Sequence, residues 1–155
     1  MNRGVFFSKL AVFLLTSVFS NLVLAEQLVT TDSDATIINK TELIKIDVKL
    51  GDGELAAVGH EVKVHYTGWL YSEKAIDHHG KKFSTSYSLP VKPLKFSLGS
   101  GSVIKGWDLG VEGMKVGGKR TLIVPSEMAY GEKGGGEVIP PNVILIFDIE
   151  LLEVQ

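Results

Sequence analysis

The sequence of 155 residues contains no cysteine. This absence excludes a disulfide framework, thiol catalysis, iron–sulfur clusters, cysteine-ligated zinc and a lipid anchor on an N-terminal cysteine. The chain also lacks an excess of basic charge, since 16 Lys and Arg face 18 Asp and Glu for a formal net charge of -2. Nucleic-acid binding needs a basic stripe, so we expect no nucleic-acid partner. The 17 glycines indicate many turns and favour a β-rich fold.

Residues 1–25 differ from the rest and have the pattern of a secretory signal peptide. Two basic residues precede an apolar core at residues 10–19, and compact residues lead to a cleavage site after Ala25. The alternative is an uncleaved membrane anchor, but Ser20 and Asn21 end the apolar run before the roughly 20 residues that a span needs. We therefore expect export and no stable membrane insertion once the signal is removed. Cleavage leaves 14 basic and 18 acidic residues, a net charge of -4.

Residues 26–41 are polar and show no sustained hydrophobic period. We expect an exposed N-terminal arm here, because such a segment has too few apolar residues to form a core of its own. The arm is too short for a long dimerisation helix. No other dimerisation segment is visible, so the sequence predicts a monomer.

From residue 42 onward, short runs in which apolar and polar residues alternate predict five strands. These runs cover residues 42–50, 61–70, 92–98, 119–124 and 143–154. The first half of the last run is apolar on both faces, which indicates a central strand covered on both sides. Residues 71–82 and 131–141 lie between the runs and are predicted to be loops.

One segment has a helical period instead. Its apolar stripe consists of Val103, Ile104, Trp107, Val111 and Met114. Ser102 is the expected N-cap of this helix. A single amphipathic helix can bury its apolar stripe only by covering one face of the sheet. The sequence therefore predicts an α+β domain over residues 42–155, in which a strongly twisted antiparallel sheet wraps around one short helix.

Reactive side chains in recognisable arrangements are missing. There is no Gly-x-Ser-x-Gly elbow and no Ser-x-x-Lys motif. The glycines at 134–136 lack a following Lys and do not open a helix, so they do not form a phosphate loop. His78 and His79 have no third ligand at a recognisable spacing, and we predict a solvated loop there rather than a metal site. We expect neither a metal nor a cofactor.

Aromatic and aliphatic residues instead gather near the ends of the predicted elements. They are Tyr66, Phe83, Phe96, Val103, Ile104, Trp107, Tyr130, Ile139 and Phe147. Pattern alone leaves two interpretations equally open, a buried core or the lining of a pocket. Trp107 differs from the others because it lies on the sole helix, whose apolar stripe must face the inside of the sheet. A concave pocket between helix and sheet would have the Trp107 ring as its floor.

Several motifs in order resemble the FKBP-type peptidyl-prolyl isomerases. The resemblance covers roughly residues 42–155, and each motif alone is weak, whereas the full series at family-like spacing is specific. The motifs are Val64-His65-Tyr66-Thr67-Gly68, Gly80-Lys81-Lys82-Phe83, Phe96-Ser97-Leu98-Gly99, Val103-Ile104-Lys105-Gly106-Trp107-Asp108, Gly113-Met114-Lys115-Val116-Gly117, Ala129-Tyr130-Gly131, Val138-Ile139-Pro140-Pro141-Asn142 and Leu145-Ile146-Phe147-Asp148-Ile149-Glu150-Leu151. Together with a secretion signal, they are similar to small periplasmic members of that family.

The resemblance implies an FKBP-like half-barrel of five antiparallel strands, proline-containing polypeptides as substrates, macrolide inhibitors as possible ligands, and a role in folding exported proteins in the periplasm. It also implies a proline pocket with Trp107 as its floor, and a backbone N–H of Ile104 and a hydroxyl of Tyr130 that bond the substrate. We accordingly predict two groups of site residues. The catalytic group is Tyr66, Phe83, Trp107, Tyr130 and Phe147, and the substrate-binding group is Ser84, Phe96, Val103, Ile104 and Ile139.

The sequence departs from the family pattern at Ser84, where members usually have an Asp whose carboxylate bonds inside the pocket. A hydroxyl is smaller and uncharged, so we expect lower activity or lower macrolide affinity. Leu94 stands where many members have an aromatic residue. These departures leave an alternative open, a proline-binding or chaperone-like module with little catalysis.

Overall fold

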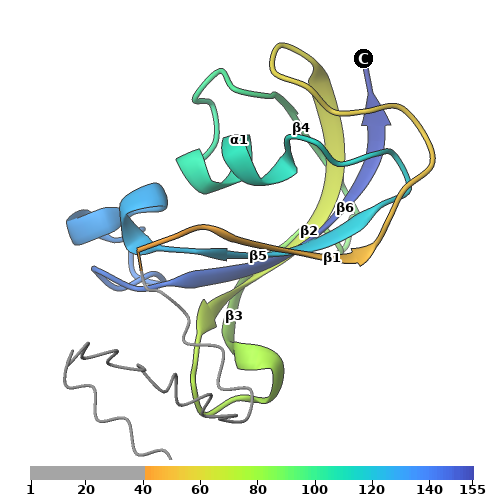
Figure 1. The fold of residues 1–155 in the computed structure, drawn as a ribbon. Helices are drawn as coiled ribbons and strands as arrows, with labels where there is room; N and C mark the ends of the chain where they lie inside the picture. The colour runs from red at the N-terminus through yellow and green to blue at the C-terminus, as the bar shows by residue number, and fades with distance from the viewer. Residues whose placement is uncertain (1–40) are drawn as a thin grey trace, which may run out of the picture. The chain divides into compact units, whose positions relative to one another are not determined.

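The computed structural model describes residues 41–155, which form six strands, one α-helix and three single-turn 3-10 helices (Figure 1). The strands are β1 (Ile44–Lys49), β2 (Glu61–Tyr71), β3 (His79–Thr85), β4 (Leu94–Ser97), β5 (Lys119–Val124) and β6 (Leu145–Val154). The helices are α1 (Lys105–Val111), η1 (Ile76–His78), η2 (Ser126–Met128) and η3 (Gly131–Lys133). The predicted signal peptide and all but the last residue of the predicted arm lie outside the described residues.

All six strands belong to one antiparallel sheet with the order β1-β5-β6-β2-β3, and β4 also pairs with β2. The long strand β2 pairs with β6 along one edge. Its other edge pairs first with β4, through residues 61–64, and then with β3, from Thr67 onward. The sheet is open rather than a closed barrel, and α1 lies against one of its faces (Figure 1). The predicted fold class is confirmed, as is the central place of the last strand.

Three details of the prediction are wrong. The sheet has a sixth strand, β3, whose first residues were predicted to belong to a loop. This stretch contains Gly80 and two lysines and does not alternate, but the second half of β2 supplies a hydrogen-bonding edge for it. Helix α1 is shorter than its apolar stripe, and Ile104 rather than Ser102 is its N-cap, with no side-chain cap bond. The Ser102 hydroxyl instead accepts a hydrogen bond from Ser100 Oγ at 2.9 Å.

The prediction of a solvated loop at His78 and His79 is also wrong, because both rings pack against aromatic side chains. The His78 ring stacks on Tyr71 with a centroid distance of 4.8 Å, and the His79 ring meets Trp69 edge-on at 4.3 Å. His79 Nε2 also lies 3.3 Å from an Asp148 carboxylate oxygen. Among residues 41–155, no group of three or more His, Cys, Asp and Glu side chains could hold a metal ion.

Two glycines allow α1 to lie unusually close to the sheet. Gly106 and Gly110 are four residues apart, so they face the same way on the helix. A Cβ added at Gly106 would lie 2.3 Å from Val124 Cγ1, and one added at Gly110 would lie 2.4 Å from Leu122 Cδ1. Both of these β5 side chains are fully buried. The glycines therefore fix the depth at which the helix, and Trp107 on it, sits in the concave face.

Arg120 of β5 ties the end of the helix to the edge of the sheet. Its NH1 group donates to the carbonyl oxygens of Gly110 at 2.8 Å and Glu112 at 3.2 Å, where a helix end has carbonyls without partners. Its Nε donates to Asp47 on β1 at 2.7 Å. The hydrogen bond from Arg120 lowers the pKa of the Asp47 carboxyl below its ordinary value. One buried guanidinium thus joins β1, β5 and α1.

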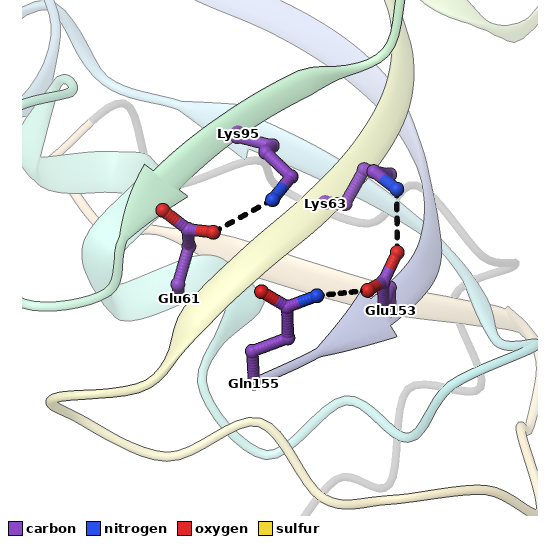
Figure 2. A network of polar contacts seen from close by, with 5 residues as sticks. All are labelled: Glu61, Lys63, Lys95, Glu153 and Gln155. Carbon is purple, nitrogen blue, oxygen red and sulfur yellow. Dashed lines mark hydrogen bonds and ion pairs between the residues drawn. The ribbon is translucent and has the colours of Figure 1, made fainter.

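A second group of charges lies where β2, β4 and β6 run side by side (Figure 2). Lys95 bonds Glu61 at 2.8 Å, Lys63 bonds Glu153 at 2.5 Å, and Gln155 donates to the same Glu153. The two lysines and two glutamates balance in charge. Exposed pairs of this kind contribute about 0.2–1 kcal/mol each, so we interpret this group as support for strand register rather than as a functional site.

Within residues 41–155, no helix has the length and apolarity that crossing a membrane requires.

Candidate functional site

A cavity of about 750 Å³ opens between the concave face of the sheet, helix α1 and two loops. The sheet contributes Tyr66, Phe83, Ser84, Leu94 and Phe147, and the segment around the helix start contributes Gly101, Ser102, Val103, Ile104 and Trp107. The loop after β5 contributes Tyr130, Gly135, Val138 and Ile139. Residues from four strands, one helix and two loops therefore meet at one hollow.

Trp107 forms the base of this cavity and is 4% exposed. Aromatic rings surround its indole at angles that favour edge-to-face contact. Tyr66 meets it with centroids 4.9 Å apart at 79°, and Phe147 does so at 5.3 Å and 88°. Phe83 in turn meets Phe147 edge-on at 5.7 Å. These contacts pack the rings of the floor and walls edge to face against one another, so that together they give the cavity a defined shape.

The Tyr66 hydroxyl and the Ser84 hydroxyl bond each other at 2.9 Å inside the cavity. Either oxygen can be the donor, so one proton of the pair remains available for a third group. Both residues are uncharged. None of the fourteen lining residues is Asp, Glu, Lys, Arg or His. The cavity therefore offers apolar rings and a few neutral hydrogen-bonding groups, and its lining, among the described residues, carries no charged side chain.

The rim before α1 is held by a carboxylate of the helix itself. Asp108 accepts hydrogen bonds from the backbone N–H groups of Gly99 at 2.8 Å and Gly101 at 3.0 Å, one on each oxygen. Both glycines have positive φ, 79° and 71°, a conformation that other residues adopt with strain. A loop of this composition has high conformational freedom, and the carboxylate removes much of it next to the cavity.

The opposite rim is closed by short backbone bonds. Gly135 N–H donates to the Ile139 carbonyl at 2.8 Å, and Asn142 N–H donates to the Gly131 carbonyl at 2.9 Å. These bonds turn Ile139 inward, where it is 5% exposed, while Tyr130 remains 42% exposed at the mouth. The floor is thus buried, and one aromatic residue of the rim is partly exposed to solvent.

The structure brings together nine of the ten site residues predicted from the sequence. Phe96 is the exception, because its ring packs beside that of Trp107 at a centroid distance of 5.8 Å and does not line the cavity. The lining also includes Leu94, Gly101, Ser102, Gly135 and Val138, which the prediction did not assign to the site. Three of these are glycine or serine in rim loops, and only the folded loops bring them to the cavity.

Known proteins share both the sequence and the fold of this domain. Residues 52–152 match the model of the FKBP-type peptidyl-prolyl cis-trans isomerase family. The chain is 52% identical over 112 residues to an FK506-binding protein of Neisseria meningitidis serogroup A, covering 72% of this chain and 95% of that protein. It is 52% identical over 100 residues to the peptidyl-prolyl cis-trans isomerase FPR2 of Saccharomyces cerevisiae, covering 64% and 69%.

A solved structure agrees with these similarities. The crystal structure of FkpA from Escherichia coli matches with a TM-score of 0.61 and 42% identity. The match covers 73% of this chain and 48% of FkpA, so the chain spans about half of that protein's length.

Proposed function

Because the chain belongs to the FKBP-type peptidyl-prolyl cis-trans isomerase family, we propose that the cavity above Trp107 accelerates rotation about Xaa–Pro bonds by binding the twisted amide. That the chain is a peptidyl-prolyl cis-trans isomerase follows from the family and from relatives such as yeast FPR2. The observation that supports this mechanism is an aromatic cavity whose described lining carries no charged side chain.

The reaction explains why reactive groups are unnecessary. Rotation about the amide faces a barrier of about 18–20 kcal/mol because resonance keeps the bond planar. Uncatalysed exchange takes roughly 10–100 s. In the transition state the carbonyl is turned out of conjugation and the proline nitrogen becomes pyramidal. No covalent bond breaks, so neither a nucleophile nor a general base is required.

A cavity with these walls favours the twisted amide in two ways. The planar amide is the more polar form and loses more on leaving water, so an apolar site destabilises it relative to the twisted form. A site shaped for the twisted form also binds it more tightly than either planar isomer. About 7 kcal/mol of such differential binding would accelerate the reaction roughly 10⁵-fold.

Each wall has a part in this proposal. The Trp107 ring supports the proline ring from below, with Tyr66, Phe83 and Phe147 around it and Val103 and Ile139 at the sides. The Tyr66–Ser84 hydroxyl pair retains a proton that can be donated to a substrate oxygen. The backbone N–H of Ile104 and the hydroxyl of Tyr130 are proposed to hold the peptide on either side of the proline.

The same cavity is proposed to accept macrolides of the FK506 type. Support comes from the names of the relatives, which are FK506-binding proteins. Because the macrolide would lie on the indole of Trp107, we expect saturable quenching of its fluorescence. The absence of saturable quenching at micromolar ligand would contradict an intact pocket.

We further propose that the domain is monomeric and acts on exported proteins in the periplasm. Residues 1–25 begin with basic residues, continue with an apolar core and end with compact residues before a cleavage site, a pattern that supports export. Fractionation of expressing cells, with N-terminal sequencing of the mature protein, tests this. The expected N-terminus is Glu26, and retention of residues 1–25 in a membrane fraction would contradict the proposal.

A protease-coupled assay on an Xaa-Pro peptide tests the activity itself. We expect exchange well above the buffer rate, and we expect Trp107→Ala to lower it strongly. Turnover no faster than buffer, with peptide still bound, would instead favour a proline-binding module with little catalysis.

A further inference from the structure

Strand β2 has a short gap in its ladder next to the cavity. One edge of β2 pairs with β4 as far as Val64, and its pairing with β3 begins at Thr67. Tyr66 lies in the gap, where neither strand offers it a regular ladder partner. An unpaired backbone group at this place would be free to move, and it belongs to a residue that lines the cavity.

Ser86, which directly follows β3, fills this gap. The Tyr66 N–H donates to Ser86 Oγ at 2.8 Å, the Ser86 N–H donates to the Tyr66 carbonyl at 3.0 Å, and Ser86 Oγ lies 3.2 Å from the same carbonyl. The hydroxyl also lies 2.9 Å from His65 Nδ1. Ser86 is 7% exposed, and among residues 41–155 only Ser86 and Arg120 are polar or charged side chains that are buried.

From these contacts we propose that Ser86 is a positioning residue of the isomerase site, which acts through Tyr66. Two serines from one strand end then hold the same tyrosine. Ser84 bonds the phenol at 2.9 Å, and Ser86 bonds the backbone. The ring between these two points packs edge-on against Trp107. Ser86 does not line the cavity, so it sets where the Tyr66 ring lies without touching the substrate.

The inference rests on the proposed function, and its test separates the two. The first measurement is kcat/KM of the wild type for an Xaa-Pro peptide. Turnover no faster than the buffer rate would contradict the proposed function and would leave the role of Ser86 in placing Tyr66 to the fluorescence test below. Ser86→Ala is then expected to lower kcat/KM about fivefold, mainly in kcat, because the ring is misplaced in the transition state. At 1.36 kcal/mol per factor of ten, fivefold corresponds to about 1 kcal/mol, the usual net contribution of one hydrogen bond. Ser86→Thr keeps the hydroxyl and is expected to stay within about twofold of wild type.

Thr121→Val is the matched control. Its hydroxyl lies on β5 and donates to Asp148 Oδ1 at 2.7 Å, so the variant loses a side-chain hydrogen bond of the sheet that involves neither Tyr66 nor its partners. We expect stability to fall in both variants but kcat only in Ser86→Ala. In a Tyr66→Ala background, Ser86→Ala is expected to change kcat/KM less than twofold, because no ring remains to be placed. Equal losses in both backgrounds, or an unchanged kcat in Ser86→Ala, would overturn the inference.

A fluorescence measurement keeps the inference testable without any activity. The chain has two tryptophans, so a Trp69→Phe background reports Trp107 alone, whose ring centroid lies 4.9 Å from that of Tyr66. Ser86→Ala is expected to change the Trp107 emission, and Thr121→Val is expected to leave it unchanged. If the alanine variant does not fold, Ser86→Cys replaces it, because a thiol is a weak hydrogen-bonding group. Emission identical to the parent would count against a role in placing Tyr66.

Discussion

The close approach of α1 to β5 leads to a quantitative prediction for Gly106→Ala. Two effects oppose each other. Alanine is favoured over glycine within a helix by about 1 kcal/mol, which would stabilise the variant. The new Cβ, however, would lie 2.3 Å from Val124 Cγ1 and 3.0 Å from Cγ2, far inside the 3.5–4.0 Å at which carbon atoms attract.

The steric effect is expected to win. Val124 is fully buried and branched at Cβ, so it has few alternative rotamers to adopt. Overpacking of a core costs about 1–3 kcal/mol, and more for severe overlaps. After the gain in helix propensity, we expect a net loss of about 1–2 kcal/mol. In urea, with a slope of about 1–3 kcal/mol per M, the unfolding midpoint should fall by roughly 1 M.

The assay is urea unfolding of four proteins: wild type, Gly106→Ala, Val124→Ala and the double variant. Val124→Ala alone leaves a cavity and also destabilises, but it removes the atoms with which the new methyl group collides. The double variant should therefore be more stable than the sum of the single losses predicts, by about 0.5–3 kcal/mol of coupling. Lys105→Ala, an exposed change on the same helix, is the control and should have little effect. A Gly106→Ala variant as stable as wild type, or strictly additive losses, would refute the close approach.

Three further predictions concern the cavity and its supports. Ser84→Asp should raise kcat/KM or macrolide affinity, because members of the family usually have an Asp at this position whose carboxylate forms a hydrogen bond inside the pocket; unchanged values of both would show that the serine is not limiting. Asp108→Ala should raise KM several-fold by releasing the rim glycines, and Asp108→Asn, which keeps one acceptor oxygen, should raise it less; peptide titrations that give the same KM for all three proteins would contradict this. Because the pKa of Asp47 is lowered in the folded state, its pairing with Arg120 stabilises the fold above about pH 4, the ordinary Asp range, and this contribution is lost as pH falls through the lowered folded-state pKa. Thermal unfolding of Asp47→Asn should accordingly depend less on pH below 4 than that of wild type, and parallel curves would be the contrary result.

The alternation of apolar residues was sufficient to predict most of the sheet. The strand at residues 119–124 has the same bounds in the structure, and the doubly apolar start of the last strand correctly placed it at the centre. Strand β3 escaped prediction because its residues have little strand character of their own. It forms because the second half of β2 has a free edge, and that edge is a property of the folded sheet.

The candidate site was predictable to a similar extent, and mainly through family resemblance. Motif order assigned Ser84 and Tyr130 to a pocket, which periodicity could not do. Phe96 lies on the same face of β4 as the lining residue Leu94, two residues earlier, and a sequence pattern cannot tell which of the two reaches the cavity. Ser86 gave no sequence signal, since its importance depends on where the edge of β2 changes partner.

The central position of β6 bears on when the sheet can assemble. Its hydrogen-bonding partners β2 and β5 begin about 84 and 26 residues earlier in the chain, and no other strand joins β2 to β5. Until the residues of β6 are available, the two halves of the sheet have no shared hydrogen bonds. Pairing over such a long sequence separation also has a high entropic cost, which slows folding. A chain emerging from the ribosome therefore cannot join the two halves of its sheet until its last strand has been made.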